Sequence, residues 1–381
     1  MSAADNQAPG GGPELNPFLR LMVRKGASDL FFSAGTEPAI KINGRIHRIE
    51  KAGTMRGADT EALARQVMSE QEQQRFQETL EMNLALDVET LGRFRVNVYR
   101  QRGACSLVIR HITDYIPGIA ELGLPALLEE LVMERQGLVL VVGSTGSGKS
   151  TTLASMIDYR NRNTVSHIIT VEDPIEFVHR HRQSIVDQRE LGLDTLSWEA
   201  ALSNAMREAP DVLLIGEIRD RASMQHAIGY AETGHLCLST LHANNASQTL
   251  NRVMNFFPES AHQQVLTDLS EHVRAILCQR LVRTLDGGRT PAVEIMLNTP
   301  HISDLIADGQ LEGLRTAISR GRELGMQTLD QSLFDLYSAG RISKEEALAN
   351  ADSRNDLRLR IRLQENPGDD WAPDLDLESG Q

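Results

Sequence analysis

Eight consecutive residues, Gly143–Ser150, read GSTGSGKS and match the spacing G-x-x-x-x-G-K-[ST]. Glycines let backbone N–H groups curve around phosphate oxygens, and a following helix adds partial positive charge. In such loops the lysine, here Lys149, reaches the β- and γ-phosphates, and the serine hydroxyl, here Ser150, ligates Mg²⁺. A flexible Gly/Ser linker is the alternative, but an apolar strand before the loop and an amphipathic helix after it favour a nucleoside triphosphate site. The residues predicted to bind the nucleotide are Gly143, Ser144, Thr145, Gly146, Ser147, Gly148, Lys149, Ser150 and Thr151.

Two acidic residues that follow short apolar runs can complete a hydrolytic site. Glu172 follows a strand expected at Ile168–Val171, and Glu217 follows one expected at Val212–Ile215. Ligands bind at the carboxyl ends of strands in parallel sheets, and hydrolysis needs a residue that orients water and an acid near Mg²⁺. Either residue can instead be an exposed carboxylate in a turn, and the sequence leaves open which of the two polarises water.

His235 and His242 lie on either side of a third apolar run, which is expected to form a buried strand. A histidine at a strand end can sense a γ-phosphate. A lone histidine is more often a core or surface residue with an ordinary hydrogen bond, and composition alone does not favour the functional role.

The elements that must position these residues form a predicted α/β domain at 124–363. Short apolar runs there alternate with helical stretches, which is typical of a parallel sheet, and helical signals dominate from about residue 299. Residues 16–112 combine helical patterns with alternating strands and an Asn-Gly hairpin signal, which indicates a small α+β domain. Residues 113–123 are expected to form a linker. The ends, 1–15 and 364–381, are expected to be disordered tails, the second of them acidic.

The composition excludes several classes of protein. The formal charge of −13 over 381 residues argues against a dedicated duplex-DNA-binding protein. The longest apolar run, Leu138–Val142, is far shorter than the roughly 20 residues of a membrane span. The cysteines, Cys105, Cys237 and Cys278, are too far apart to suggest a disulfide framework or a zinc site. No charged-then-apolar leader opens the chain, so we expect a cytoplasmic protein with no direct membrane insertion.

Seven collinear blocks resemble the retraction-type ATPases of type IV pili, closest to the PilU-like branch of that family, within the wider secretion-ATPase superfamily. They are GASDLFFSAG (26–35), RFRVNVYRQRGA (93–104), GSTGSGKSTTLASMIDY (143–159), VEDPIEFVH (171–179), DVLLIGEIRD (211–220), AETGHLCLSTLHANNA (231–246) and GMQTLD (325–330). The resemblance implies that Glu172 is the catalytic glutamate and that Glu217 belongs to an atypical Walker B motif, near Mg²⁺ directly or through water. It also implies that His235 and His242 form a histidine box.

The fold that the resemblance implies is a PAS-like N-terminal domain linked to a RecA-like domain, assembled as a hexameric ring. Nucleotide is then expected between the two domains and against a neighbouring subunit. Arginines of the N-terminal domain complete the site in this family, and the matching positions here are Arg95 and Arg110. The alternative is a solvated strand face, because arginine alternates with apolar residues along this stretch.

The implied function is an ATP-hydrolysing motor that supports pilus retraction and twitching motility. The expected partners are other copies of the chain, a PilT-like ATPase and a PilC-like platform protein of the inner membrane, with no nucleic acid. One departure is the stretch His301–Ile306, HISDLI, where the PilT-like ATPases carry an AIRNLI-like helix with an Arg-Asn pair, a departure that is similar to the PilU-like branch. The alternatives are an accessory ATP-binding scaffold of the retraction ring and an ATPase of pilus assembly or type II secretion. A DNA-translocating RecA-like ATPase is more distant.

Overall fold

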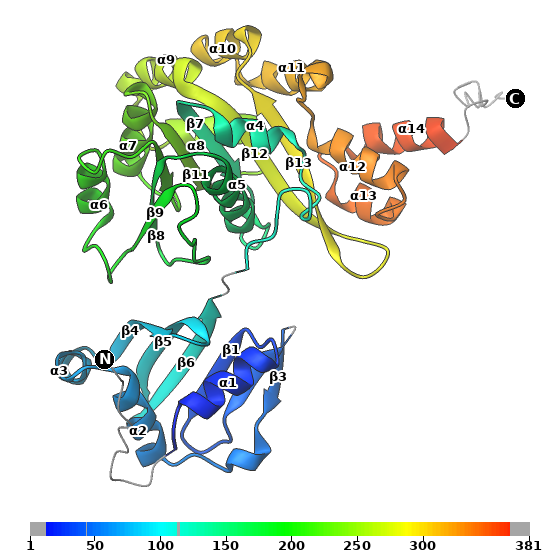
Figure 1. The fold of residues 1–381 in the computed structure, drawn as a ribbon. Coiled ribbons are helices and arrows are strands. Elements are labelled where there is room, and N and C mark those ends of the chain that lie inside the picture. Colours follow the sequence, from blue (N-terminus) through cyan, green and yellow to red (C-terminus); the bar gives the residue numbers. More distant parts are fainter. Residues whose placement is uncertain (1–12, 43, 113–114, 366–381) are drawn as a thin grey trace, which may run out of the picture. The chain divides into compact units, whose positions relative to one another are not determined.

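The computed structural model describes residues 13–42, 44–112 and 115–365. Most of both expected tails, two residues of the expected linker and Asn43 of the hairpin signal lie outside these residues. The chain divides into two compact units (Figure 1), Met1–Tyr115 with Ile175–Val178, and Ile116–Pro174 with His179–Gln381. Each is described by itself.

The first unit is a six-stranded antiparallel sheet in the order β3-β2-β1-β6-β5-β4, with three helices. The strands are β1 (Asp29–Ser33), β2 (Ala39–Ile42), β3 (Arg45–Arg48), β4 (Glu81–Val88), β5 (Gly92–Gln101) and β6 (Ala104–Ile112), and the helices are α1 (Asn16–Arg24), α2 (Gly57–Val67) and α3 (Glu70–Thr79). Alternate strand residues such as Phe32 and Phe94 share one core with Leu19, Leu63 and Phe76 of the three helices. The helices therefore cover one face of the sheet.

The start of the first unit differs from the expected tail boundary. Pro13 O accepts a hydrogen bond from Gln66 Nε2 at 2.9 Å, and Leu15 is buried. Helix α3 begins with a capping box, since Ser69 Oγ accepts from Glu72 N and the Glu72 carboxylate accepts from Ser69 N.

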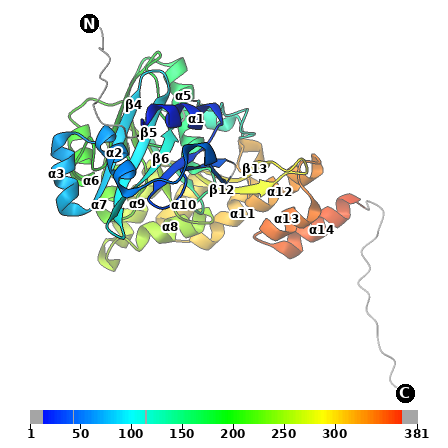
Figure 2. The same cartoon turned by 90° about the horizontal axis from the view of Figure 1, so that it is seen from below.

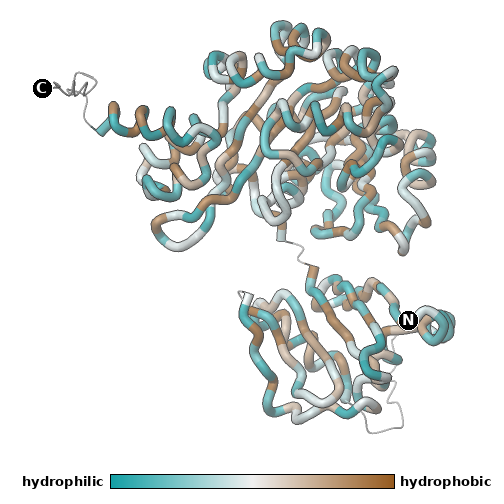
Figure 3. Tube along the Cα trace, turned by 180° about the vertical axis from the view of Figure 1, so that it is seen from behind, coloured by the Kyte–Doolittle hydropathy of each residue, from teal (hydrophilic) through white to brown (hydrophobic). Residues whose placement is uncertain are grey.

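The second unit contains a seven-stranded sheet in the order β13-β12-β7-β11-β10-β8-β9. Its strands are β7 (Gly137–Val142), β8 (His167–Glu172), β9 (Ile185–Glu190), β10 (Val212–Ile215), β11 (Leu236–Leu241), β12 (Val273–Arg283) and β13 (Arg289–Leu297). Six strands are parallel, and β13 runs antiparallel to β12. The central parallel strands β7, β10 and β11 are buried at every residue, as is expected where helices cover both faces (Figure 3), whereas the edge strand β9 is more polar.

Helices pack on both faces of this sheet (Figures 1 and 2). They are α4 (Leu127–Met133), α5 (Lys149–Asn163), α6 (Trp198–Ala205), α7 (Arg221–Glu232), α8 (Ala246–Met254), α9 (His262–His272), α10 (Pro300–Ala307) and α11 (Leu314–Arg320). Val139 and Val141 of β7 point to the core shared with α4 and α5. Leu138, Leu140 and Val142 point to the opposite core, shared with the helices from α6 to α11.

Three further helices close the described chain: α12 (Leu329–Ser338), α13 (Lys344–Asn350) and α14 (Arg354–Glu365). They form a small core of their own around Leu333 and Leu357, which includes Val282 and Ala292 from the hairpin of β12 and β13. Helix α14 continues to Glu365, two residues beyond the expected domain end. Within the described ranges, no helix is long and apolar enough to cross a membrane.

Candidate active site

The loop Gly143–Gly148 connects the carboxyl end of β7 to the first turn of α5. Gly143 and Gly148 have φ values of 154° and 89°, and both meet strand β12 closely. A Cβ atom on Gly143 would lie 2.4 Å from Gln279 O, and one on Gly148 would lie 2.8 Å from Gln279 Nε2. Backbone conformation and crowding therefore both require glycine here. The loop directs the N-terminus of a 15-residue helix toward the space that a phosphate would occupy.

Lys149, the first residue of α5, folds back over the loop. Its Nζ donates to Gly143 O and to Ser144 O, each at 3.0 Å, and the residue is buried. Ser150 follows it in the same first helical turn. The lysine is thus held beside the loop, within reach of phosphate oxygens bound there.

Glu217 follows β10 and is held by two side chains. Its Oε1 lies 2.9 Å from His242 Nε2, and its Oε2 accepts from Arg219 Nε at 2.6 Å. The other ring nitrogen, His242 Nδ1, lies 3.3 Å from Gly143 O. His242 thereby joins the phosphate loop to Glu217.

Glu172 ends β8, which is the neighbour of β10 in the sheet. Its Oε1 accepts from Thr170 Oγ1 at 2.7 Å and from Gln188 Nε2 at 3.2 Å. Gly216 approaches it closely, since a Cβ there would lie 3.2 Å from the Cα of Glu172. The two glutamates therefore lie at the carboxyl ends of adjacent strands, on the side of the sheet where a nucleotide bound to the loop would meet them.

Arg219 connects the segments that carry these two acids. Besides its bond to Glu217, its Nη1 lies 3.6 Å from Asp173 Oδ2. The hydrogen bond and charge of Glu217 raise the pKa of this guanidinium, which as an arginine is a permanent cation. These contacts of Arg219 were not predicted from the sequence. The one sequence signal for them is its place two residues after Glu217.

His235 lies at the opposite end of β11 from the phosphate loop. Its backbone O accepts from Gly137 N, at the start of β7, whereas Leu241 O accepts from Gly143 N, at the end of that strand. The rise of an extended strand places the two histidines about 20 Å apart, at opposite ends of β11. His235 Nδ1 lies 3.0 Å from Thr233 Oγ1, and the ring meets Tyr230 edge-on. Within a single chain, His242 therefore contacts the phosphate loop and His235 lies at the far end of β11, because β11 runs parallel to β7.

Arg95 and Arg110 belong to the first unit, and they pair directly across β5 and β6. They project from the sheet face opposite the helices, because the alternate residues Phe94, Val96 and Ile109 enter the core. Arg110 Nε donates to Asp29 Oδ1 at 2.9 Å, and its side chain is 63% exposed. Arg95 and Arg110 are therefore not among the residues that the second unit itself brings to the site.

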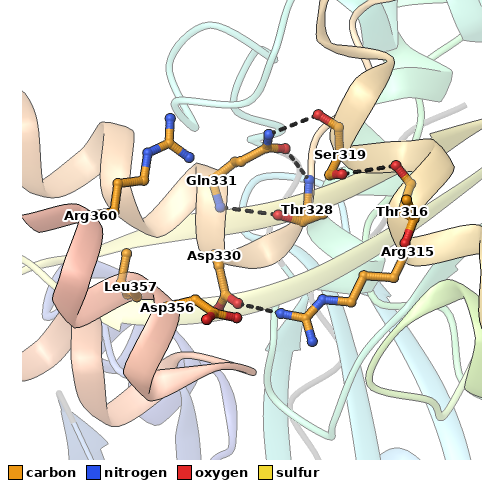
Figure 4. A pocket seen from close by; sticks show the side chains of 9 residues that line it. All are labelled: Arg315, Thr316, Ser319, Thr328, Asp330, Gln331, Asp356, Leu357 and Arg360. Atoms are coloured by element: carbon orange, nitrogen blue, oxygen red, sulfur yellow. Dashed lines mark hydrogen bonds and ion pairs between the residues drawn. The ribbon is translucent and has the colours of Figure 1, made fainter.

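A separate pocket of about 290 Å³ lies among α11, α12 and α14 (Figure 4). Arg315 Nη2 donates there to Asp330 Oδ2 at 2.8 Å, and Asp330 also accepts from the backbone N of Asp352 and Ser353. These bonds tie α12 to the start of α14, so the polar side chains of the pocket have a structural explanation. No group of three or more His, Cys, Asp or Glu residues within the described part of the chain forms a metal site.

Comparison with known proteins agrees with this geometry. A family model described as "Type II/IV secretion system protein" matches residues 12–333. The type IV pilus ATPase PilU of Pseudomonas aeruginosa is 51% identical over 351 residues, which is 92% of each chain. The retraction ATPase PilT of the same organism is 40% identical over 338 residues, 89% of this chain and 98% of PilT.

The solved structures include the pilus retraction motor PilT with bound ADP. It matches with a TM-score of 0.86 at 39% identity, over 91% of this chain and 99% of that chain. This likeness confirms the predicted α/β, RecA-like fold and the resemblance drawn from the seven sequence blocks. The chain belongs to the type II/IV secretion system protein family, and within it to the ATPases that resemble PilT and PilU.

Proposed function

We propose that this ATPase is the subunit of a homohexameric motor that supports type IV pilus retraction together with a PilT-like ATPase. The observation that carries the proposal is the joined site of the second unit. The phosphate loop, His242 and Glu217 are in direct contact, and Glu172 lies on the adjacent strand. The chain that holds this site is 51% identical to a protein named as a type IV pilus ATPase.

Each residue of the site has its own role in the hydrolysis of ATP. Backbone N–H groups of the loop bind the phosphates, and Lys149 stabilises charge on the γ-phosphoryl group. Glu172 orients the attacking water. A bound Mg²⁺ would neutralise phosphate charge, and the oxygen donors at this edge of the sheet fit it: the Ser150 hydroxyl directly and Glu217 directly or through water. No covalent intermediate is required.

The first unit contributes in this proposal as a PAS-like domain. Its exposed sheet face carries Arg95 and Arg110, which would reach the nucleotide of a ring and stabilise transferred charge as arginine fingers do. Motion of the two units during the ATP cycle would then act on a PilC-like platform protein. The chain would work in the cytoplasm, at the inner membrane through that partner, without nucleic acid.

A second candidate function is an accessory, non-motor subunit of a PilT ring, and helix α10 favours it. In the stretch HISDLI, Ile302 and Ile306 are buried, and Ser303 and Asp304 take the positions of the Arg-Asn pair of PilT-like ATPases. Ser303 Oγ donates to Ser270 O at 2.8 Å, and Asp304 is exposed. The positions that carry a cation and an amide in the motif of PilT-like ATPases therefore carry a hydroxyl and a carboxylate here.

The variant Glu172→Gln distinguishes the two functions. It removes the carboxylate that orients water while it keeps the side chain's size, so we expect ATP binding to persist and phosphate release to fall by at least about 100-fold, the typical contribution of a general base. The variant is expressed in a strain that lacks the parent gene but retains its PilT-like ATPase. If the chain is a motor, the variant should not restore the twitching that the parent gene restores. Full twitching with this variant would refute the motor function and support the accessory, non-motor function.

A further inference from the structure

Gln279 of β12 lies beside the phosphate loop, although 132 residues separate it from Ser147 in the sequence. Strand β12 pairs in parallel with β7, with Leu277 opposite Val141 and Cys278 opposite Val142. The next residue, Gln279, is therefore level with Gly143 at the start of the loop. It is only 4% exposed, so its polar groups must find partners within the protein.

Both ends of the Gln279 side chain are hydrogen-bonded to the loop and its helix. Nε2 donates to Ser147 O at 2.8 Å, and Oε1 accepts from Thr152 Oγ1 at 2.8 Å, both in buried surroundings. The orientation of the amide is fixed by chemistry, because a carbonyl such as Ser147 O can only accept. One buried amide thus connects the last turn of the loop to the first turns of α5.

We propose that Gln279 is a positioning residue for nucleotide binding. Its amide holds the Ser147 carbonyl back toward β12, which directs the following backbone N–H groups of the loop toward the phosphates. Gly148 is part of the same arrangement, because a Cβ there would lie 2.8 Å from Gln279 Nε2. The inference rests on the proposed function only in that the loop must bind nucleotide. Nothing in the loop motif itself points to this residue.

The contact predicts a specific kinetic signature. The loop N–H groups bind phosphates that are present equally in bound ATP and in the transition state, so their loss removes uniform binding. The variant Gln279→Met keeps the length and volume of the side chain but removes both hydrogen bonds. We expect the Kd for ADP and the KM for ATP each to rise about 10-fold, while kcat stays within about twofold.

Two other variants complete this experiment: Thr152→Val is a second test of the contact, and Gln327→Met is a control. Thr152→Val removes one of the two bonds and keeps the shape of the side chain, and we expect about threefold weaker ADP binding. It also provides a test if Gln279→Met does not fold. Gln327 is the matched control, since its Nε2 donates to a backbone carbonyl, Val293 O, at the same 2.8 Å. Gln327→Met should leave the Kd for ADP unchanged.

Gln279→Glu allows a further measurement, the pH dependence of ADP binding, which a purely structural role of Gln279 would not change. A neutral carboxyl can donate to Ser147 O and accept from Thr152, as the amide does, whereas a carboxylate repels both Ser147 O and the phosphates. Burial favours the neutral form at acidic pH. The ratio of the variant's Kd to the parent's should therefore rise at least about 10-fold between pH 6 and pH 8.

The measurements are titrations of a fluorescent ADP analogue and steady-state phosphate release, made on the purified full chain. Parent-like Kd values for both Gln279→Met and Thr152→Val would overturn the proposal, as would an equal loss in Gln327→Met. A ratio for Gln279→Glu that does not change with pH would also overturn it. A parent chain that binds no ADP would instead overturn the nucleotide site itself, which separates the two failures.

Discussion

The contact of His242 with both the phosphate loop and Glu217 predicts that removing the ring lowers the rate of ATP hydrolysis. His242→Ala deletes the 2.9 Å contact to Glu217 Oε1 and the longer one, 3.3 Å, to Gly143 O. A hydrogen bond to a charged group contributes about 1.5–3 kcal/mol. The His242 side chain is 38% exposed, so we take the lower part of that range, about 1.5–2 kcal/mol. At about 1.4 kcal/mol per factor of ten, kcat/KM should fall about 10- to 30-fold.

The assay is steady-state phosphate release over a range of ATP concentrations, with the melting temperature of each variant measured in parallel. His262 is a suitable control, because its Nε2 also lies near a backbone carbonyl, Phe257 O at 3.1 Å, outside the site. A double-mutant cycle with Glu217→Gln tests the coupling: if the pair acts as a unit, the double variant loses little more than the worse single variant. A kcat/KM of His242→Ala within twofold of the parent, or an equal loss in His262→Ala, would refute the reasoning.

Two further predictions concern single side chains of the second unit. Lys149→Ala removes the only lysine of the loop, whose Nζ lies 3.0 Å from Gly143 O and Ser144 O, and we expect phosphate release to fall to background; release at the parent rate would show that the site is elsewhere. Burial raises the pKa of Glu294, whose Oε1 accepts from Ala246 N at 2.8 Å. Below the ordinary carboxyl pKa both states are protonated, so the burial penalty appears only as pH rises above it. Glu294→Gln keeps the acceptor and cannot ionise. The melting temperature of the variant minus that of the parent should therefore increase between pH 4.5 and pH 7.5. A difference that does not change with pH would contradict this.

The sequence predicted the loop and both glutamates because their signals are local. Glycine spacing fixes where a backbone can cradle phosphate, and an apolar run followed at once by an acid predicts a carboxylate at a strand's carboxyl end. The structure places Glu172 at the end of β8 and Glu217 just after the adjacent strand β10, as that interpretation requires.

The sequence could not distinguish the histidines that flank β11, nor find Gln279 and Arg219. These depend on strand order and direction, which set the neighbours of each residue across the sheet and are not encoded in any short window. Because β11 runs parallel to β7, one end of it meets the phosphate loop and the other lies a strand's length away. Because β12 pairs with the opposite edge of β7, a glutamine with no motif around it comes to hold the loop. The sequence by itself therefore determined which chemistry this chain carries, and only the tertiary structure decided which side chains assemble around it.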